Sequence, residues 1–154
     1  MSTLDIAIQI ASKAHEGQKD KSGLPYILHP LHLMNELKKK NMSEDYLIVA
    51  VLHDVVEDTD VTITDLINLD FSIPVVGAVL KMTHVKGESY SDYIDSIATN
   101  EIAKAVKLED LKHNLDITRR VIPVFNVKNE EKFMKRILKY TKSYDQLING
   151  ELNV

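Results

Sequence analysis

Residues 47–59, Leu-Ile-Val-Ala-Val-Leu-His-Asp-Val-Val-Glu-Asp-Thr, decide how this chain folds. Six apolar residues run without a break into His53 and Asp54, and two valines separate these from Glu57 and Asp58. A continuous apolar run is typical of a buried segment. Three carboxylates and one histidine at the end of such a segment are costly unless something compensates them. A bound metal cation is the simplest compensation.

The spacing of these polar residues indicates that they belong together. On a helix, His53 and Glu57 lie one turn apart, and Asp54 and Asp58 do the same on the next ridge. The four side chains would then form one polar patch at the end of a core helix. The pattern alone also fits a hydrogen-bonded cluster, in which His53 caps the helix and Asp58 and Thr59 begin a turn.

Composition narrows the class of protein. A chain of 154 residues with 44% hydrophobic content is expected to form one domain, 1–154, with a proper core. It has no cysteine, so a metal site would use His, Asp and Glu, which suits Mn, Fe, Mg or Zn. The net charge of -4 argues against nucleic-acid binding. No apolar run approaches membrane-spanning length, so we expect a cytoplasmic protein without a membrane partner.

The periodicity of apolar residues predicts an all-α fold, a compact single domain of six to eight helices, because no stretch alternates with a period of two. The first helix should begin at Ser2 and end at His15–Gly17. Further helices are expected at about 29–40, 43–58, 62 onwards, 75–82, 89–98, 101–115 and 129–146.

Two more places carry residues of the metal-binding type. His29 opens the predicted second helix, and Asp110 lies among apolar residues in the helix 101–115, with Asn114 one turn further along. Together with His53 and Asp54 they form a mixed nitrogen and oxygen set from three helices. Such a set suits one divalent ion and leaves positions open for water and substrate.

The ordered pattern His29, His53-Asp54, Asp110 resembles that of the HD metal-dependent phosphohydrolases. Four sequence motifs indicate a particular group of these enzymes: Ala-His-Glu-Gly-Gln at 14–18, Ser-Gly-Leu-Pro-Tyr-Ile-Leu-His-Pro at 22–30, Val-Leu-His-Asp-Val-Val-Glu-Asp-Thr at 51–59 and Lys-Leu-Glu-Asp-Leu-Lys-His-Asn at 107–114. They are similar to the hydrolase domain of RelA/SpoT proteins and to its small stand-alone relatives. The resemblance covers about residues 4–118, and the predicted last helix carries no motif that matches.

The resemblance implies a helical HD fold that holds one ion, usually manganese. It also implies removal of pyrophosphate from the 3′ position of guanosine tetra- and pentaphosphate. The implied metal ligands are His29, His53, Asp54 and Asp110. Glu57 and Asp58 match the acidic pair that orients and activates the attacking water. Lys21 matches a basic residue near the substrate phosphates or base, and Asn114 matches a substrate-contacting asparagine.

The sequence departs from this family where the substrate is recognised. Asp20 stands where these hydrolases usually have a basic residue that packs on the guanine, and His84 stands where a lysine often follows the threonine. We therefore expect weak activity on guanosine tetraphosphate, mainly through a raised KM. An HD-type nucleotidase or phosphatase with another substrate, and a catalytically silent nucleotide-sensing module, stay open as alternatives. The intact Glu57–Asp58 pair argues against the silent module.

Some residues allow two interpretations. Tyr26 could line the pocket or pack within its loop, and His113 could contact phosphate or bond within the core. His15, His32 and His84 are expected to be structural or surface residues. The sequence does not predict an oligomeric state.

Overall fold

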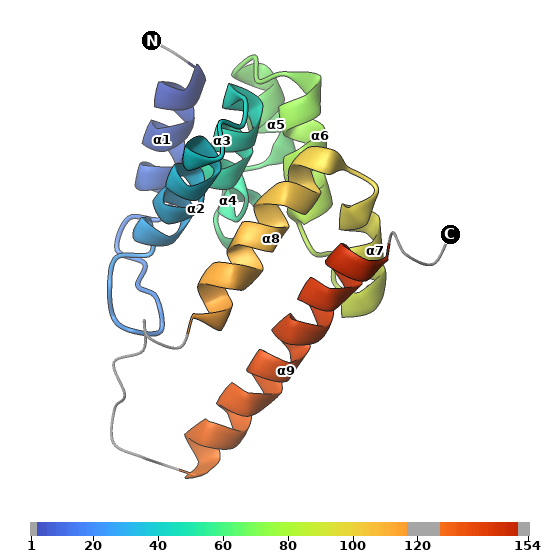
Figure 1. The fold of residues 1–154 in the computed structure, drawn as a ribbon. Coiled ribbons are helices and arrows are strands. Elements are labelled where there is room, and N and C mark those ends of the chain that lie inside the picture. Colours follow the sequence, from blue (N-terminus) through green and yellow to red (C-terminus); the bar gives the residue numbers. More distant parts are fainter. Residues whose placement is uncertain (1–2, 117–126, 151–154) are drawn as a thin grey trace.

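The computed structural model describes residues 3–116 and 127–150, and these form helices with no strand among them (Figure 1). The helices are α1 (Thr3–Ala14), α2 (Leu28–Lys39), α3 (Glu44–Leu52), α4 (Val55–Asp58), α5 (Ile63–Asn68), α6 (Ile73–Met82), α7 (Tyr90–Ala98), α8 (Glu101–Leu115) and α9 (Val127–Asn149). The all-α prediction is confirmed. Ser2, the expected start of the first helix, lies outside the described residues. None of the described helices is both long enough and apolar enough to span a membrane.

Helix α3 is the centre of the fold. All six of its residues from Leu47 to Leu52 are buried, and α1, α2, α6 and α8 pack around it. A helix that is apolar on every side is stable only when it is surrounded in this way. The end of α3 is therefore fixed in position by the whole core, and His53 follows it directly.

The helix expected over 43–58 is interrupted, which corrects the sequence prediction. Helix α3 ends at Leu52, and the single turn α4 begins at Val55. The imidazole Nδ1 of His53 lies 2.8 Å from the carbonyl oxygen of Ala50, and such side-chain bonds compete with continuation of the helical ladder. Asp54 adopts φ -108° and ψ -5°. Counted with α4 as one interrupted helix, the described residues hold eight helices, the upper limit of the expected range.

Capping residues fix the starts of α5 and α8. Thr62 and Asp65 form the expected capping box at the start of α5. The Asn100 side chain accepts a hydrogen bond of 2.9 Å from the Ala103 amide at the start of α8. The bounds of α8 match the predicted helix 101–115, so the position of Asp110 in its third turn was predictable.

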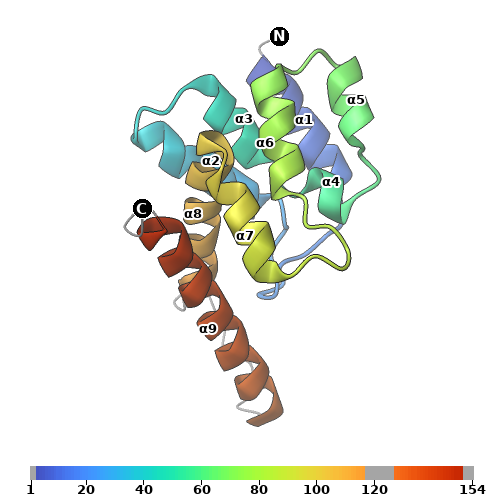
Figure 2. The same cartoon turned by 90° about the vertical axis from the view of Figure 1, so that its right-hand side faces the viewer.

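Helix α9 is longer than the predicted helix 129–146, and it packs on α7 and α8. Leu147 and Ser143 are buried near its C-terminal end. Figure 2 shows that its N-terminal half extends away from the other helices. The apolar face predicted from Phe133, Ile137, Tyr140 and Tyr144 is half-buried, which agrees with the sequence pattern.

Candidate active site

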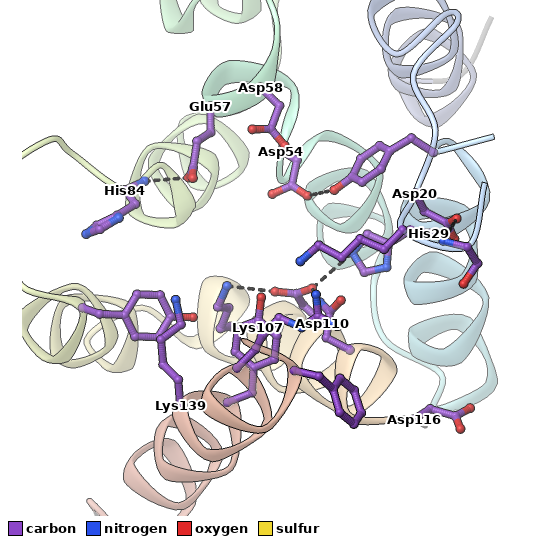
Figure 3. A pocket seen from close by; sticks show the side chains of 18 of the residues that line it. Asp20, His29, Asp54, Glu57, Asp58, His84, Lys107, Asp110, Asp116 and Lys139 are labelled. Carbon is purple, nitrogen blue, oxygen red and sulfur yellow. Dashed lines mark hydrogen bonds and ion pairs between the residues drawn. The ribbon is translucent and has the colours of Figure 1, made fainter. Parts of the chain in front are cut away.

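A pocket of about 560 Å³ opens between the loop before α2, the α3–α4 junction, α7, α8 and α9. Figure 3 shows the acidic residues of α4 on one side of it and Lys139 of α9 on another. The pocket brings together the predicted site residues Lys21, His29, Asp54, Glu57, Asp58, Asp110 and Asn114. The remaining predicted ligand, His53, is buried behind this surface with 1% of its side chain exposed.

Three of the predicted ligands form a compact cluster. His29, His53 and Asp54 each offer one ligand atom, and these atoms lie within 4.8 Å of one another. The Nδ1 of His53 bonds to a carbonyl, which only accepts, so the neutral ring carries its proton there and Nε2 keeps the lone pair. Nε2 is buried and has no hydrogen-bond partner within the described part of the chain. Asp54 Oδ2 lies 2.9 Å from it and forms an ion pair with the ring when the ring is protonated.

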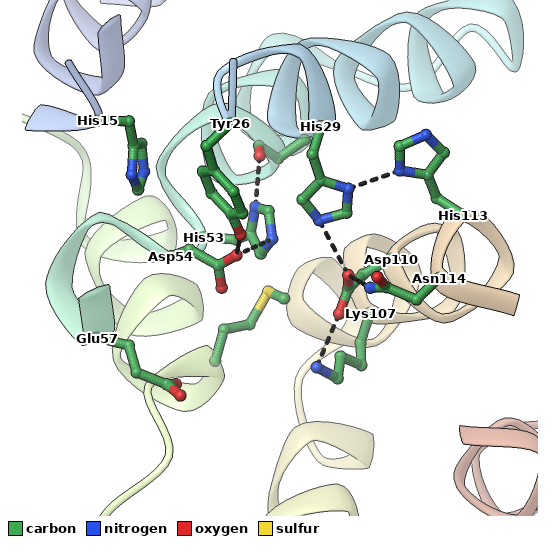
Figure 4. Close-up of polar contacts among 12 residues, drawn as sticks. His15, Tyr26, His29, His53, Asp54, Glu57, Lys107, Asp110, His113 and Asn114 are labelled. Atoms are coloured by element: carbon green, nitrogen blue, oxygen red, sulfur yellow. Dashed lines mark hydrogen bonds and ion pairs between the residues drawn. The ribbon is translucent and has the colours of Figure 1, made fainter. Parts of the chain in front are cut away.

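The ring of His29 is held on its other nitrogen by His113. Their Nδ1 atoms are 2.6 Å apart, which leaves the Nε2 of His29 facing the carboxylate of Asp110 at 3.1 Å (Figure 4). His113 also stacks on His32 with ring centroids 4.0 Å apart. Of the two roles left open by the sequence, His113 therefore takes the one within the core.

Asp110 lies beside the cluster but outside it. Its Oδ1 accepts a hydrogen bond of 2.6 Å from Asn114, and its Oδ2 accepts one of 2.8 Å from the ammonium group of Lys107. Burial alone would raise the pKa of Asp110, but Lys107 and then His29 outweigh it and hold the pKa well below its usual range. Asp110 is thus a charged, buried carboxylate next to His29.

The cluster fits a divalent cation. Two imidazoles and a carboxylate are suitable donors, and each imidazole is oriented by a bond to its other nitrogen, as in many metal sites. Burial lowers the pKa of His53, but the charges of Asp54 and Asp110 outweigh it and raise the pKa to about 9. A buried imidazole nitrogen close to two carboxylates is an arrangement whose negative charge a metal ion compensates.

Glu57 and Asp58 line the pocket next to the cluster. Glu57 Oε2 accepts a hydrogen bond of 2.9 Å from the backbone amide of His84, which orients its side chain. Burial, followed by repulsion from Asp54 and Glu57, raises the pKa of Asp58. A carboxylate with a raised pKa binds a proton more readily, which suits a general base.

The sequence motifs at 14–18 and 22–30 hydrogen-bond to the acidic residues Asp54 and Asp58. The hydroxyl of Tyr26 donates to Asp54 Oδ2, and Tyr26 lines the pocket, which decides between its two interpretations. The Oε1 of Gln18 accepts a hydrogen bond of 2.8 Å from the Nδ1 of His15, and its Nε2 donates to the carbonyl of Asp58 at 3.2 Å. These two motifs therefore position Asp54 and α4.

The two departures from the family pattern both line the pocket. Asp20 Oδ1 accepts hydrogen bonds from the amides of Ser22 and Leu24, at 2.8 and 3.0 Å, so its carboxylate shapes its own loop. The ring of His84 lies 3.0 Å from the carbonyl oxygen of Glu88, again within one loop. Neither side chain replaces the basic group that the family pattern has in its place.

Sequence reasoning missed several pocket residues: Lys107 of α8 and Phe133, Arg136, Lys139 and Tyr140 of α9. Lys107 lies three residues before Asp110, a spacing that pairs charges on a helix and could have identified it. For α9 the signal was only the grouping of basic and aromatic residues at helical spacing, which is common on protein surfaces.

Comparison with known proteins agrees with this geometry. A family profile described as HD domain matches residues 7–121. The GTP pyrophosphokinase of Streptomyces coelicolor is 35% identical over 125 residues, which is 75% of this chain and 15% of that protein. The guanosine-3′,5′-bis(diphosphate) 3′-pyrophosphohydrolase of Aquifex aeolicus is 30% identical over 139 residues, which is 86% of this chain and 19% of that protein. The chain spans less than a fifth of the length of these two curated relatives.

A solved structure has the same fold along nearly the whole chain. It is described as a metazoan ortholog of SpoT that hydrolyzes ppGpp and plays a role in starvation responses. The TM-score is 0.69 at 24% identity, with 98% of this chain and 97% of that chain covered. The profile match, the helical architecture and the His and Asp cluster agree, and the chain belongs to the HD domain family.

Proposed function

We propose that this protein is a divalent-metal-dependent hydrolase that removes pyrophosphate from the 3′ position of guanosine 3′,5′-bis(diphosphate). The observation that carries the proposal is the compact cluster of His29, His53 and Asp54, whose ligand atoms lie within 4.8 Å of one another at a pocket lined by Glu57 and Asp58. The name of the Aquifex aeolicus relative supports the choice of substrate.

The proposed ligands of the ion are His29, His53, Asp54 and Asp110. The mixed nitrogen and oxygen donors suit manganese, which is the metal we propose. When bound, a divalent ion lowers the pKa of water and neutralises phosphate charge. The bond from Lys107 to Asp110 Oδ2 keeps this buried carboxylate ionised and oriented.

Asp58 is the proposed proton acceptor and Glu57 its orienting partner. Partial burial, followed by repulsion from Asp54 and Glu57, raises the pKa of Asp58, so its carboxylate takes a proton from water more readily than an isolated aspartate does. Glu57 is fixed by the amide of His84 and contributes a second acceptor for the same water. Hydrolysis adds water across the 3′ phosphoester linkage, and the products are guanosine 5′-diphosphate and pyrophosphate.

Lys21 and Asn114 are the proposed substrate contacts within the HD motifs, because both line the pocket beside the cluster. The ligand is then a phosphorylated nucleotide, and no nucleic acid or membrane partner is required. We further propose that residues 1–154 act as one domain in the cytoplasm. The packing of α9 on α7 and α8 supports one domain.

The test is product analysis with manganese-loaded protein. Guanosine 3′,5′-bis(diphosphate), GTP, GDP and nucleoside monophosphates are supplied in parallel, and pyrophosphate and orthophosphate are measured separately. We expect equimolar pyrophosphate and GDP from the first nucleotide, with no orthophosphate, and loss of this activity in a Glu57→Gln, Asp58→Asn double variant. Faster turnover of another nucleotide would favour the nucleotidase alternative. No turnover of any nucleotide by metal-loaded protein would favour the silent module.

A further inference from the structure

The pocket has a basic wall that lies outside the HD domain match. The matched residues end at 121, and α9 begins at Val127. Helix α9 contributes two cations, Arg136 and Lys139, and two aromatic rings, Phe133 and Tyr140, to the pocket. Residues 133, 136 and 140 follow the spacing of one helix face, and 139 lies beside them.

The two cations of this wall lie near aromatic rings. Within residues 3–116 and 127–150, neither Arg136 nor Lys139 makes an ion pair with a carboxylate. Lys139 Nζ lies 4.0 Å from the centre of the Tyr90 ring, and the Arg136 guanidinium lies 5.7 Å from that of Phe133. Burial and then the charge of Lys107 lower the pKa of Lys139. Positive charge is thus concentrated on this side of the pocket, and no carboxylate among the described residues forms an ion pair with it.

The opposite side of the pocket carries Lys19 and Lys21 on one loop, with Asp20 between them. Its loop carries Asp20 where the family pattern has a basic residue, and the carboxylate is occupied by the amides of Ser22 and Leu24. Figure 3 shows Asp20 and Lys139 on opposite sides of the pocket, with Asp54 and Asp110 between them. A ligand whose reacting phosphate lies at the metal cluster therefore finds a further group of cations, Arg136 and Lys139, on α9, on the side of the pocket away from Lys19 and Lys21.

We propose that Arg136 and Lys139 bind the phosphate groups at the 5′ end of the nucleotide, the end that does not react, and thereby determine specificity. Guanidinium and ammonium groups form charge-assisted bonds to phosphate oxygens. Phe133 and Tyr140 flank these cations and offer aromatic surface to the rest of the nucleotide. The identity of the reacting end rests on the proposed function, whereas binding of 5′ phosphates by α9 does not.

The experiment compares two double variants with the same change in charge. One is Arg136→Gln with Lys139→Gln. The control is Lys135→Gln with Lys142→Gln, which removes two exposed cations of α9 that do not line the pocket. KM and kcat are measured with guanosine 3′,5′-bis(diphosphate) and with guanosine 3′-diphosphate, which has a 5′ hydroxyl. Thermal unfolding shows whether both variants are folded.

For the first substrate we expect KM to rise at least tenfold in the pocket variant, with kcat changed less than twofold, because remote contacts contribute equally to ground and transition states. For the substrate without 5′ phosphates, KM should be the same as in wild type. The control variant should change KM less than threefold for both. An equal rise for both substrates, an equal rise in both variants or no rise in either would overturn the proposal.

A binding experiment tests the role of α9 independently of the proposed hydrolase activity. Calorimetric titration of GDP and of guanosine into wild-type and variant protein needs no turnover. If the protein hydrolyses none of the nucleotides but GDP binding weakens tenfold in the pocket variant alone, the α9 assignment stands and the hydrolase assignment fails. If wild type binds GDP no more tightly than guanosine, α9 does not hold 5′ phosphates and the assignment is wrong.

Discussion

The two sides of the pocket are built on different principles. On the metal side, His29, His53 and Asp110 are almost fully buried and oriented by bonds to other protein groups. On the α9 side, Arg136 and Lys139 are partly exposed and have no acidic partner within the described residues. A site for chemistry requires fixed geometry, which only a core can impose. A site for binding a mobile polyanion can use long side chains on a single helix.

Lys107 connects the two sides, and its replacement should have the largest effect on stability. In Lys107→Met, the buried carboxylate of Asp110 loses its cation, and removal of one partner from a buried pair costs about 3–5 kcal/mol. Urea unfolding of metal-free protein measures this. Lys132→Met, an exposed change on α9, is the control and should be neutral. Saturating manganese should reduce the difference, because an ion would compensate Asp110 as well.

The same pair gives a pH dependence of stability. The pKa of Asp110 is depressed in the folded protein, so its stabilisation is fully present above the unfolded value of about 3.9 and is lost as the pH falls through the folded pKa. The stability difference between wild type and Lys107→Met should therefore be constant from pH 6 to 8 and shrink in acid. A difference that grows in acid would show that the pair does not stabilise the fold.

Glu57→Gln and Asp58→Asn should have the next largest effect. Each change keeps the shape of the side chain but removes a proton acceptor, and turnover should fall by about a hundredfold or more. Elemental analysis should find the metal content unchanged, because neither residue belongs to the His29, His53 and Asp54 cluster. Unchanged turnover in both variants would mean that the proton acceptor lies elsewhere in the pocket.

Metal affinity should rise with pH. His53, whose pKa is raised to about 9, must lose a proton before it binds a cation. Manganese affinity should then rise by about tenfold per pH unit between pH 6 and 9 and level off above that, as one proton is released for each ion bound. Fluorescence or calorimetric titration at three pH values checks this. Affinity that falls with rising pH would exclude His53 as a ligand.

The contrast also explains what could be predicted from sequence. A buried polar residue requires apolar residues around it and polar partners near it, and both requirements leave a pattern in the sequence. The apolar run that ends at His53 therefore predicted the core helix and the cluster at its end. The cap residues Thr62 and Asn100 predicted two helix starts, which the structure confirms. The prediction of one helix over 43–58 was wrong. The helix is interrupted where the His53 ring bonds to the carbonyl of Ala50, and the periodicity of apolar residues does not show this bond.

The remaining features depend on tertiary packing. The stacking of His113 between His29 and His32 joins α2 to α8, and no local pattern indicates it. The role of Arg136 and Lys139 depends on where α9 packs, since their spacing would look the same on a solvated face. An exposed cation tolerates many residue types around it in the sequence. The α9 side of the pocket therefore has no motif that sequence analysis could identify.

The most direct test of the central claim is the metal content of Asp54→Ala. Wild type, Asp54→Ala and the exposed control Asp60→Ala are loaded with manganese, desalted and analysed for metal and protein. The proposed site predicts one ion per chain in wild type and control, and less than a tenth of that in Asp54→Ala, with all three proteins folded. Equal metal in all three proteins would contradict the assignment of the cluster.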